Sequence, residues 1–154
     1  MRTKEINKWI EEGGSLPQDL TLEEEVHLTK LGWSVRRDWH SCGQKWYEWN
    51  FLHGKDHGKW EEWHPNGQKR YERHYFHGKP HGKQERWYTN GQKGYEHHYL
   101  HGKEHGIYRG WSLNGQKEYE YHYFHGMNHG VFKKWNAVGN LITDHEYFYG
   151  NRIK

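Results

Sequence analysis

The stretch WHPNGQKRYERHYFHGKPHGKQER runs from Trp63 to Arg86, and Trp87 begins the same phrase again. Tryptophan recurs every 24 residues, as do the turn triplet Gly-Gln-Lys and a doubled His-Gly. The recurring tryptophans are Trp39, Trp63, Trp87, Trp111 and Trp135. A fixed period of this length indicates a stacked repeat architecture, in which each unit packs on its neighbours.

Each unit has the pattern of a β-hairpin. Asn-Gly and His-Gly are turn signals, and short alternating runs lie between them. In QKEYEYHYF, Tyr119, Tyr121 and Tyr123 fall on one side of an extended chain, and a period of two predicts a strand. The chain is therefore expected to be all-β: an antiparallel β-hairpin solenoid, which is an elongated, single-layer twisted sheet.

The length of the Asn-Gly loop decides which side chains share a face. A three-residue loop with Gly67 in the left-handed conformation places Trp63 on the face of Tyr71. A two-residue loop instead places Trp63 with Glu72 and His74. We favour the first register because it gathers the rings. It predicts a positive φ at three glycines, Gly67, Gly91 and Gly115.

The His-Gly turn is expected to agree with that register. A three-residue loop, Gly78-Lys79-Pro80, places His77 opposite His81, and Phe76 opposite a glycine that its ring can cover. One face is then expected to carry tyrosines, tryptophans and paired histidines. The other carries phenylalanine and mostly charged residues.

The first 34 residues lack the repeat. We expect residues 1–34 to form an N-terminal cap and residues 35–154 an array of about five units. Thr3 is expected to N-cap a short helix that ends at Gly13-Gly14. The alternation of apolar residues over 20–28 predicts one or two strands before the array begins at about Val35.

The stretch YFHGKPHGKQERWYTNGQKGYE, residues 75–96, resembles the MORN repeat in its longer variant, found in arrays in bacteria and large DNA viruses. The resemblance covers roughly residues 39–150 and implies stacked β-hairpins. It also implies a scaffold, or a membrane-proximal or protein-binding module, and some bacterial relatives carry an antitoxin label. The 24-residue step and the first histidine of each unit depart from the commoner, shorter repeat. The lipid binding associated with that shorter repeat is therefore a poor guide to this sequence.

The composition bounds the partners and the compartment. A net charge of +3 is too balanced to indicate a nucleic-acid or membrane partner. A single cysteine allows no internal disulfide and suits a reducing compartment. Without an apolar leader or a membrane span, we expect an intracellular, cytoplasmic protein, or a virion component if the source is viral.

The repeated histidines and rings suggest sites, but architecture explains them better. No Asp, Glu or Cys recurs beside every histidine pair, so we expect no metal. No nucleophile–base arrangement or phosphate loop is present, and Cys42 replaces a turn asparagine, so we expect no catalytic residue, no cofactor and no enzyme activity.

We expect a non-enzymatic scaffold that binds a protein partner or a second copy through its rings or its C-terminal edge. The alternatives are an antitoxin-like binder that masks an enzyme, and nucleic-acid or anionic-lipid binding through the aromatic and basic face. The candidate interaction residues are Trp63, Trp87, Trp111, Tyr71, Tyr95 and Tyr119.

Overall fold

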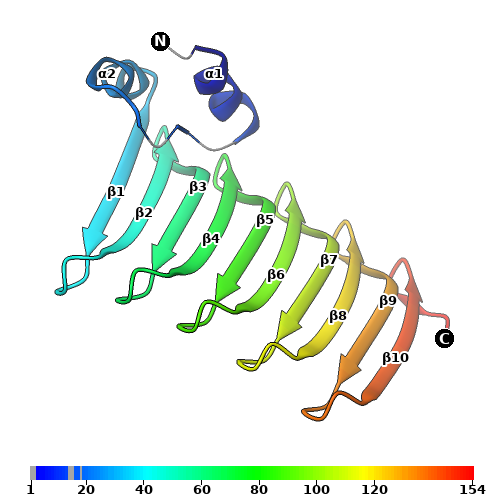
Figure 1. Cartoon of the computed structure of the whole chain (residues 1–154). Coiled ribbons are helices and arrows are strands. Elements are labelled where there is room, and N and C mark those ends of the chain that lie inside the picture. Colours follow the sequence, from blue (N-terminus) through cyan, green and yellow to red (C-terminus); the bar gives the residue numbers. More distant parts are fainter. Residues whose placement is uncertain (1–2, 14–15, 18) are drawn as a thin grey trace.

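The computed structural model describes residues 3–13, 16–17 and 19–154. They form one open sheet of eleven strands in chain order, with two short helices at its N-terminal end (Figure 1). Every described neighbouring pair is antiparallel, which confirms the all-β hairpin solenoid with an N-terminal helix. The strands are β1 (Trp33–Trp39), β2 (Lys45–Leu52), β3 (Lys55–Trp63), β4 (Lys69–Phe76), β5 (Lys79–Trp87), β6 (Lys93–Leu100), β7 (Lys103–Trp111), β8 (Lys117–Phe124), β9 (Met127–Trp135), β10 (Leu141–Phe148) and β11 (Asn151–Arg152).

The Asn-Gly turns have the predicted loop. Gly67, Gly91 and Gly115 have φ values of 80°, 81° and 82°. The backbone N–H of His64 donates to the carbonyl of Gln68 at 2.8 Å, and Trp63 pairs with Lys69. Left-handed backbone at these positions requires glycine, which explains the repeated Asn-Gly.

A β-bulge directly after this turn makes the predicted face of Trp63 wrong. Trp63 pairs with Lys69, but Glu62 pairs with Tyr71, so Arg70 is an extra residue on β4. Paired residues share a face and successive residues alternate, so this one insertion moves Trp63 to the face opposite Tyr71. The same bulge recurs in each unit.

The His-Gly turn is shorter than predicted. Phe76 pairs with Lys79, which leaves a two-residue loop of His77 and Gly78, with φ values of 48° and 83°. Two consecutive positive φ values give the mirror-image turn whose twist matches that of the flanking strands. The predicted loop Gly78-Lys79-Pro80 is therefore wrong, and His77 does not face His81 across the hairpin.

The cap consists of two helices, α1 (Thr3–Glu12) and α2 (Leu22–Lys30). The strands predicted over residues 20–28 are wrong because a capping box starts α2 there. The N–H of Glu24 donates to the Thr21 hydroxyl at 3.2 Å, and the Thr21 N–H donates to the Glu24 carboxylate at 3.0 Å. The predicted capping by Thr3 and the role of Gly14 concern groups outside the described residues, while α1 does end before Gly13, whose φ is 70°.

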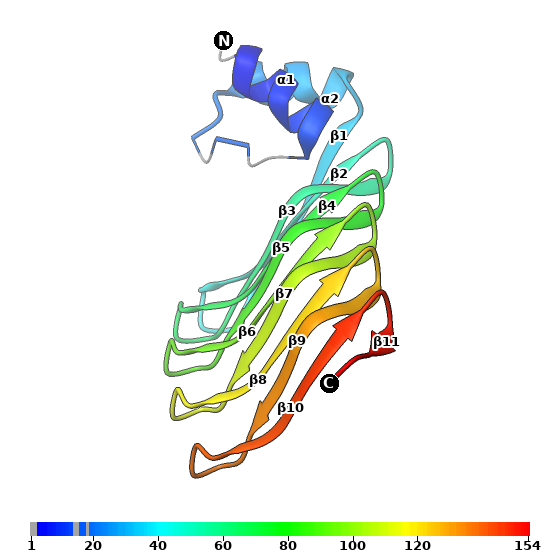
Figure 2. The same cartoon turned by 90° about the vertical axis from the view of Figure 1, so that its right-hand side faces the viewer.

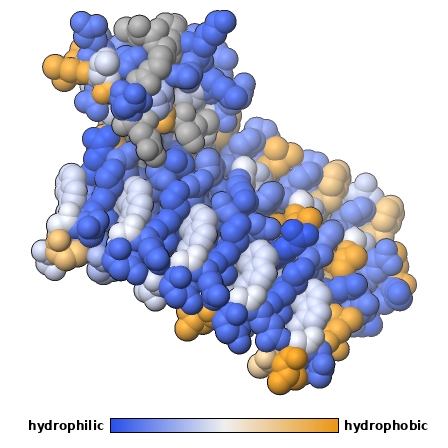
Figure 3. Space-filling model, in the orientation of Figure 1, coloured by the Kyte–Doolittle hydropathy of each residue, from blue (hydrophilic) through white to orange (hydrophobic). Residues whose placement is uncertain are grey.

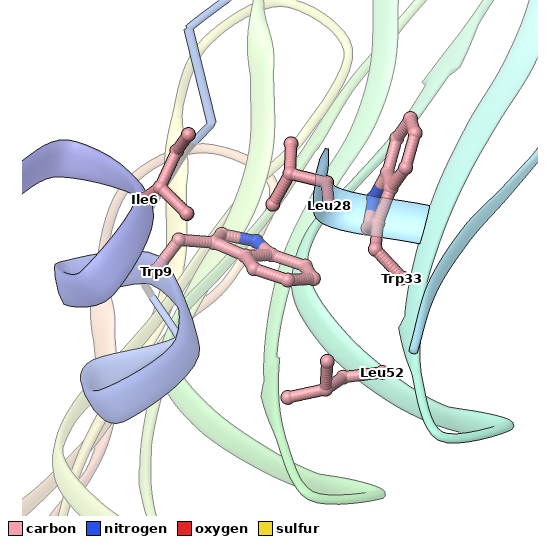
Figure 4. Packing of buried hydrophobic residues seen from close by; sticks show 5 residues of the cluster. All are labelled: Ile6, Trp9, Leu28, Trp33 and Leu52. Carbon is pink, nitrogen blue, oxygen red and sulfur yellow. The ribbon is translucent and has the colours of Figure 1, made fainter. Parts of the chain in front are cut away.

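The buried apolar cluster joins the cap to the first strands. It comprises Ile6, Trp9, Leu28, Trp33 and Leu52 (Figure 4). Viewed along the array, both helices lie on one side of the sheet (Figure 2). Trp9 packs over Gly58, where a Cβ would lie only 2.0 Å from the indole Nε1. The buried His57 imidazole bonds the Trp9 carbonyl through Nε2 at 2.6 Å, which fastens α1 to β3.

Candidate functional site

The two faces of the sheet differ in chemistry. We call one the tyrosine face, defined by Tyr71, Arg73, Tyr75 and the residues that pair with them or occupy the same positions in other units. We call the other the charged face, defined by Trp63, Glu72, His74 and their equivalents. The structure brings Tyr71, Tyr95 and Tyr119 to the first face, with the rings of Tyr71 and Tyr95 6.5 Å apart. It brings Trp63, Trp87 and Trp111 to the second, so the six predicted residues do not form one surface.

On the charged face, the rings of Trp63, Trp87 and Trp135 make contacts between units. The ammonium of Lys45 lies 5.1 Å from the centroid of the Trp63 ring, and Lys69 lies 5.8 Å from that of Trp87. The Trp63 carbonyl bonds the His40 imidazole Nε2 at 2.8 Å. These contacts link one unit to the next, and they give the tryptophans a structural role.

The charges of this face pair with one another along the array. Lys93 bridges Glu85 and Glu96, and Arg109 bridges Glu96 at 3.4 Å and Glu120 at 2.8 Å. Burial of Glu120 acts to raise its pKa, but bonds from Lys117, Arg109 and His122 outweigh it and lower the pKa to about 2. This face is turned to the viewer in Figure 3, where it is mainly hydrophilic with paler stripes that recur along it.

The middle of the tyrosine face carries stacked rings that span the hairpins closed by His-Gly. Trp49 stacks on Trp60 with centroids 4.8 Å apart, and Tyr121 stacks on Phe132 at 3.9 Å. The face also has its own charged groups, five cations against four anions, so it lacks the strong cationic excess of a phosphate-binding surface. They are Arg36, Arg73, Arg86, Lys134 and Arg152, with Asp38, Asp56, Glu62 and Glu104. Sequence reasoning missed the middle-row rings, although the alternation of Tyr47 and Trp49 in β2 carries the signal.

His97 is the most perturbed imidazole of this face. It is 6% exposed and stacks on Tyr108 at 4.2 Å. Burial lowers its pKa to about 4, and His98 adds repulsion. Its Nε2 is buried without a hydrogen-bond partner, and the Glu104 carboxylate lies 3.6 Å away, beyond hydrogen-bonding distance. Although Glu104 favours the charged imidazole, burial outweighs it, so His97 is neutral at neutral pH.

The paired histidines meet between units. The rings of His57 and His77 lie 4.9 Å apart, and those of His81 and His101 4.6 Å apart. The backbone N–H of His101 donates to the imidazole Nδ1 of His81 at 3.2 Å, so the Nδ1 of His81 carries no proton. Burial, followed by repulsion from His101, lowers the pKa of His81. The histidine pairs lie beside Phe76 and its equivalents on the charged side of the sheet. The prediction that they share a face with the tyrosines is therefore wrong.

The other predicted features have simpler roles. Within residues 3–13, 16–17 and 19–154, no three His, Cys, Asp or Glu side chains group as a metal-ligand set. Cys42 is exposed, and its thiol donates to the Pro65 carbonyl at 3.4 Å, as Asn66 donates to Thr89 one unit on. No helix in the described part of the chain is long and apolar enough to cross a membrane.

The C-terminal edge is partly covered. The short β11 pairs Asn151 with Phe148 and Arg152 with Tyr147. On β10, Ile142 is 61% exposed, and Phe148 is 56% exposed although it pairs with β11. This end of the sheet therefore presents exposed apolar side chains, whereas Phe76 and Phe124, the inner equivalents of Phe148, are half-buried.

Neither a scan against models of protein families nor a search of curated proteins finds a match to this chain. The geometry of the two faces therefore carries the functional argument.

Proposed function

We propose that this chain is a non-enzymatic scaffold, a variant MORN-type array, that binds a protein partner through its tyrosine face. The proposal rests on the contrast between the two faces. Charges on the charged face are satisfied within the sheet, and the cap covers its first strands. The tyrosine face carries half-buried rings under no further layer of described residues (Figure 2).

A surface of tyrosines suits protein recognition. Tyrosine offers a large apolar area and a polar tip at a low cost in conformational entropy, and it is enriched where partners bind. The rings hold one another in place, as in the bond from the Tyr119 hydroxyl to that of Tyr108 at 2.9 Å. Such pre-organisation lowers the entropic cost of association.

The alternatives differ in what they require. Nucleic acid or anionic lipid would require a strong cationic excess on the aromatic face, and the cations of that face exceed its anions by only one. An antitoxin-like role requires only that the partner be an enzyme whose site becomes masked, so it is a special case of the same surface. The exposed Ile142 and Phe148 offer a second contact, for a second copy of the chain.

The test uses substitutions that the array itself contains. Thr143 occupies the position of Tyr95 and Tyr119, and Asn50 occupies that of His98 and His122. Tyr95→Thr with Tyr119→Thr alters the tyrosine face, and His98→Asn with His122→Asn is the matched change on the charged face. Both double variants and the parent are used for affinity capture from the native source, followed by mass spectrometry.

We expect the parent and the charged-face variant to retain the same protein partner and the tyrosine-face variant to lose it. Circular dichroism and thermal melts first establish that both variants fold. Equal capture by all three chains would overturn the proposal. Recovery of RNA or lipid in place of protein would replace it with the alternative.

A further inference from the structure

One hairpin breaks the row of stacked rings on the tyrosine face. In three hairpins, a ring on the first strand stacks on a ring of the second with an interplanar angle of 12°. The pairs are Trp49 with Trp60, His97 with Tyr108, and Tyr121 with Phe132. In the hairpin of β4 and β5, Arg73 pairs with Gln84 at this position instead. Because the other units repeat the ring pair, this departure is specific to one place.

A cavity of about 320 Å³ opens at the break. Its walls are the rings of Tyr75, Tyr95, Tyr99 and Tyr108, together with Pro80. Arg73, Gln84 and His97 supply its polar groups. The volume lies at the lower end of the range for small-ligand sites, roughly 300–1,000 Å³, and is of the order needed for one aromatic side chain.

The polar groups of the cavity favour an anion beside that ring. The Arg73 guanidinium stacks on Tyr71 at 4.3 Å, and the Glu62 carboxylate lies 3.7 Å from it, too far for a charge-assisted hydrogen bond. Arg86, which pairs with Tyr71 in the same hairpin, has no carboxylate of a described residue within 4 Å. The hairpin thus carries more positive than negative charge on this face.

Gln84 and His97 also line the cavity. The Gln84 amide nitrogen donates to the His74 carbonyl at 2.7 Å, which holds the side chain down against the sheet. The imidazole of His97, which is nine-tenths buried and stacks on Tyr108, lines the wall with its ring.

We propose that this cavity is the anchor pocket for the partner, and that it takes an aromatic residue bearing a carboxylate, the chemistry of a peptide that ends in Trp, Tyr or Phe. The ligand ring restores the stack missing between Trp60 and His97, and its carboxylate pairs with Arg73. This inference rests on the proposed protein-binding function, for which it names the recognised group.

The probes are N-acetyl-L-tryptophan and its amide, which share the ring and differ in the carboxylate. Binding is followed by NMR titration of the Arg73 and Gln84 side-chain signals and the His97 ring. We expect the acid to bind the parent in the millimolar range or tighter, and the amide about threefold more weakly or worse.

The variant Arg73→Tyr with Gln84→Phe fills the cavity with the pair that Tyr121 and Phe132 form two units later, so it is expected to fold and to lose both probes. Arg73→Gln is expected to bind acid and amide equally. Lys134→Gln removes a cation elsewhere on the same face and is the control, with parental binding.

Two results would overturn the pocket. One is that the acid shifts the NMR signals of the filled variant as much as those of the parent. The other is that the signals of Arg73 and His97 in the parent do not shift at about 10 mM acid. Partner capture separates this inference from the proposed function. Loss of partner with the Tyr95 and Tyr119 variant, but full capture by the filled variant, overturns the anchor pocket and leaves the tyrosine face as the interface. If the parent binds the probe, but both the filled variant and the Tyr95 and Tyr119 variant capture the partner as well as the parent does, the partner does not use this cavity. That result overturns both the peptide as the ligand of the cavity and the tyrosine face as the interface.

Discussion

Lowering the pH from 7.5 to 5.5 should destabilise the array through His97. Its pKa is about 4 in the folded chain because the ring is buried, against about 6.5 when unfolded. At pH 5.5 the unfolded imidazole is mostly protonated and the folded one is not, so the unfolded state binds more protons and stability falls. The stability is retained above pH 6.5 and is lost progressively as the pH falls toward 4.

For His97 alone, the linkage relation gives a loss of about 1.3 kcal/mol between pH 7.5 and 5.5. In a chain of this length, such a loss lowers the melting temperature by about 4 °C. Burial also lowers the pKa values of His57, His81 and His98, which adds to the effect in the same direction. The carboxylates of Glu72 and Glu120 have pKa values of about 2, so their contribution is lost only below this window.

The matched control is His97→Tyr, since Tyr121 occupies this position one unit later. Thermal melts of both chains at pH 7.5 and 5.5 and equal ionic strength measure the difference. We expect the variant to lose about 4 °C less than the parent over this interval. Equal losses in the two chains would refute a neutral, buried His97, and a parent that melts as high at pH 5.5 would refute the wider role of the histidines.

Two further changes test the cap and the charged face. Gly54 and Gly58 share a φ of 73°, but a Cβ meets nothing within 4 Å at Gly54 and lies 2.0 Å from Trp9 at Gly58. Thermal melts should therefore show that Gly54→Ala costs about 1 kcal/mol and Gly58→Ala at least about 2 kcal/mol more, and equal costs would contradict the packing of α1 on β3. Arg109→Gln removes the cation between Glu96 and Glu120 and should cost about 1 kcal/mol at low salt and less at high salt; a melting temperature equal to the parent's at low salt would show that this bridge contributes nothing.

The architecture could be predicted from the sequence because the 24-residue period of the repeat is visible in it. Each Asn-Gly requires a left-handed glycine, and Gly67 and its equivalents have it. The predicted face of the tryptophans was wrong because an extra residue at a bulge, Arg70, carries no signal of its own yet places Trp63 on the face opposite Tyr71. Likewise, His77 adopts the left-handed backbone usually taken by Asn or Gly, so the two-residue turn was not evident.

The prediction for the N-terminal cap was wrong for a different reason. The alternating apolar residues over 20–28 favoured a strand, but Thr21 and Glu24 have the spacing of a capping box, which outweighs that alternation. The cavity at Arg73 and Gln84 could have been suspected from the sequence, because these positions depart from the rings of the other units. Locating it required the pairing of β4 with β5.

The central claim is that a protein partner binds the tyrosine face, and photo-crosslinking from the two faces tests it most directly. A benzophenone amino acid replaces Tyr95 on the tyrosine face or His98 on the charged face, in chains shown to melt like the parent. The account predicts that, in extract from the native source, the residue at position 95 crosslinks to a protein that the residue at position 98 does not reach. Crosslinks to that protein from position 98 alone, or equally from both positions, would contradict it.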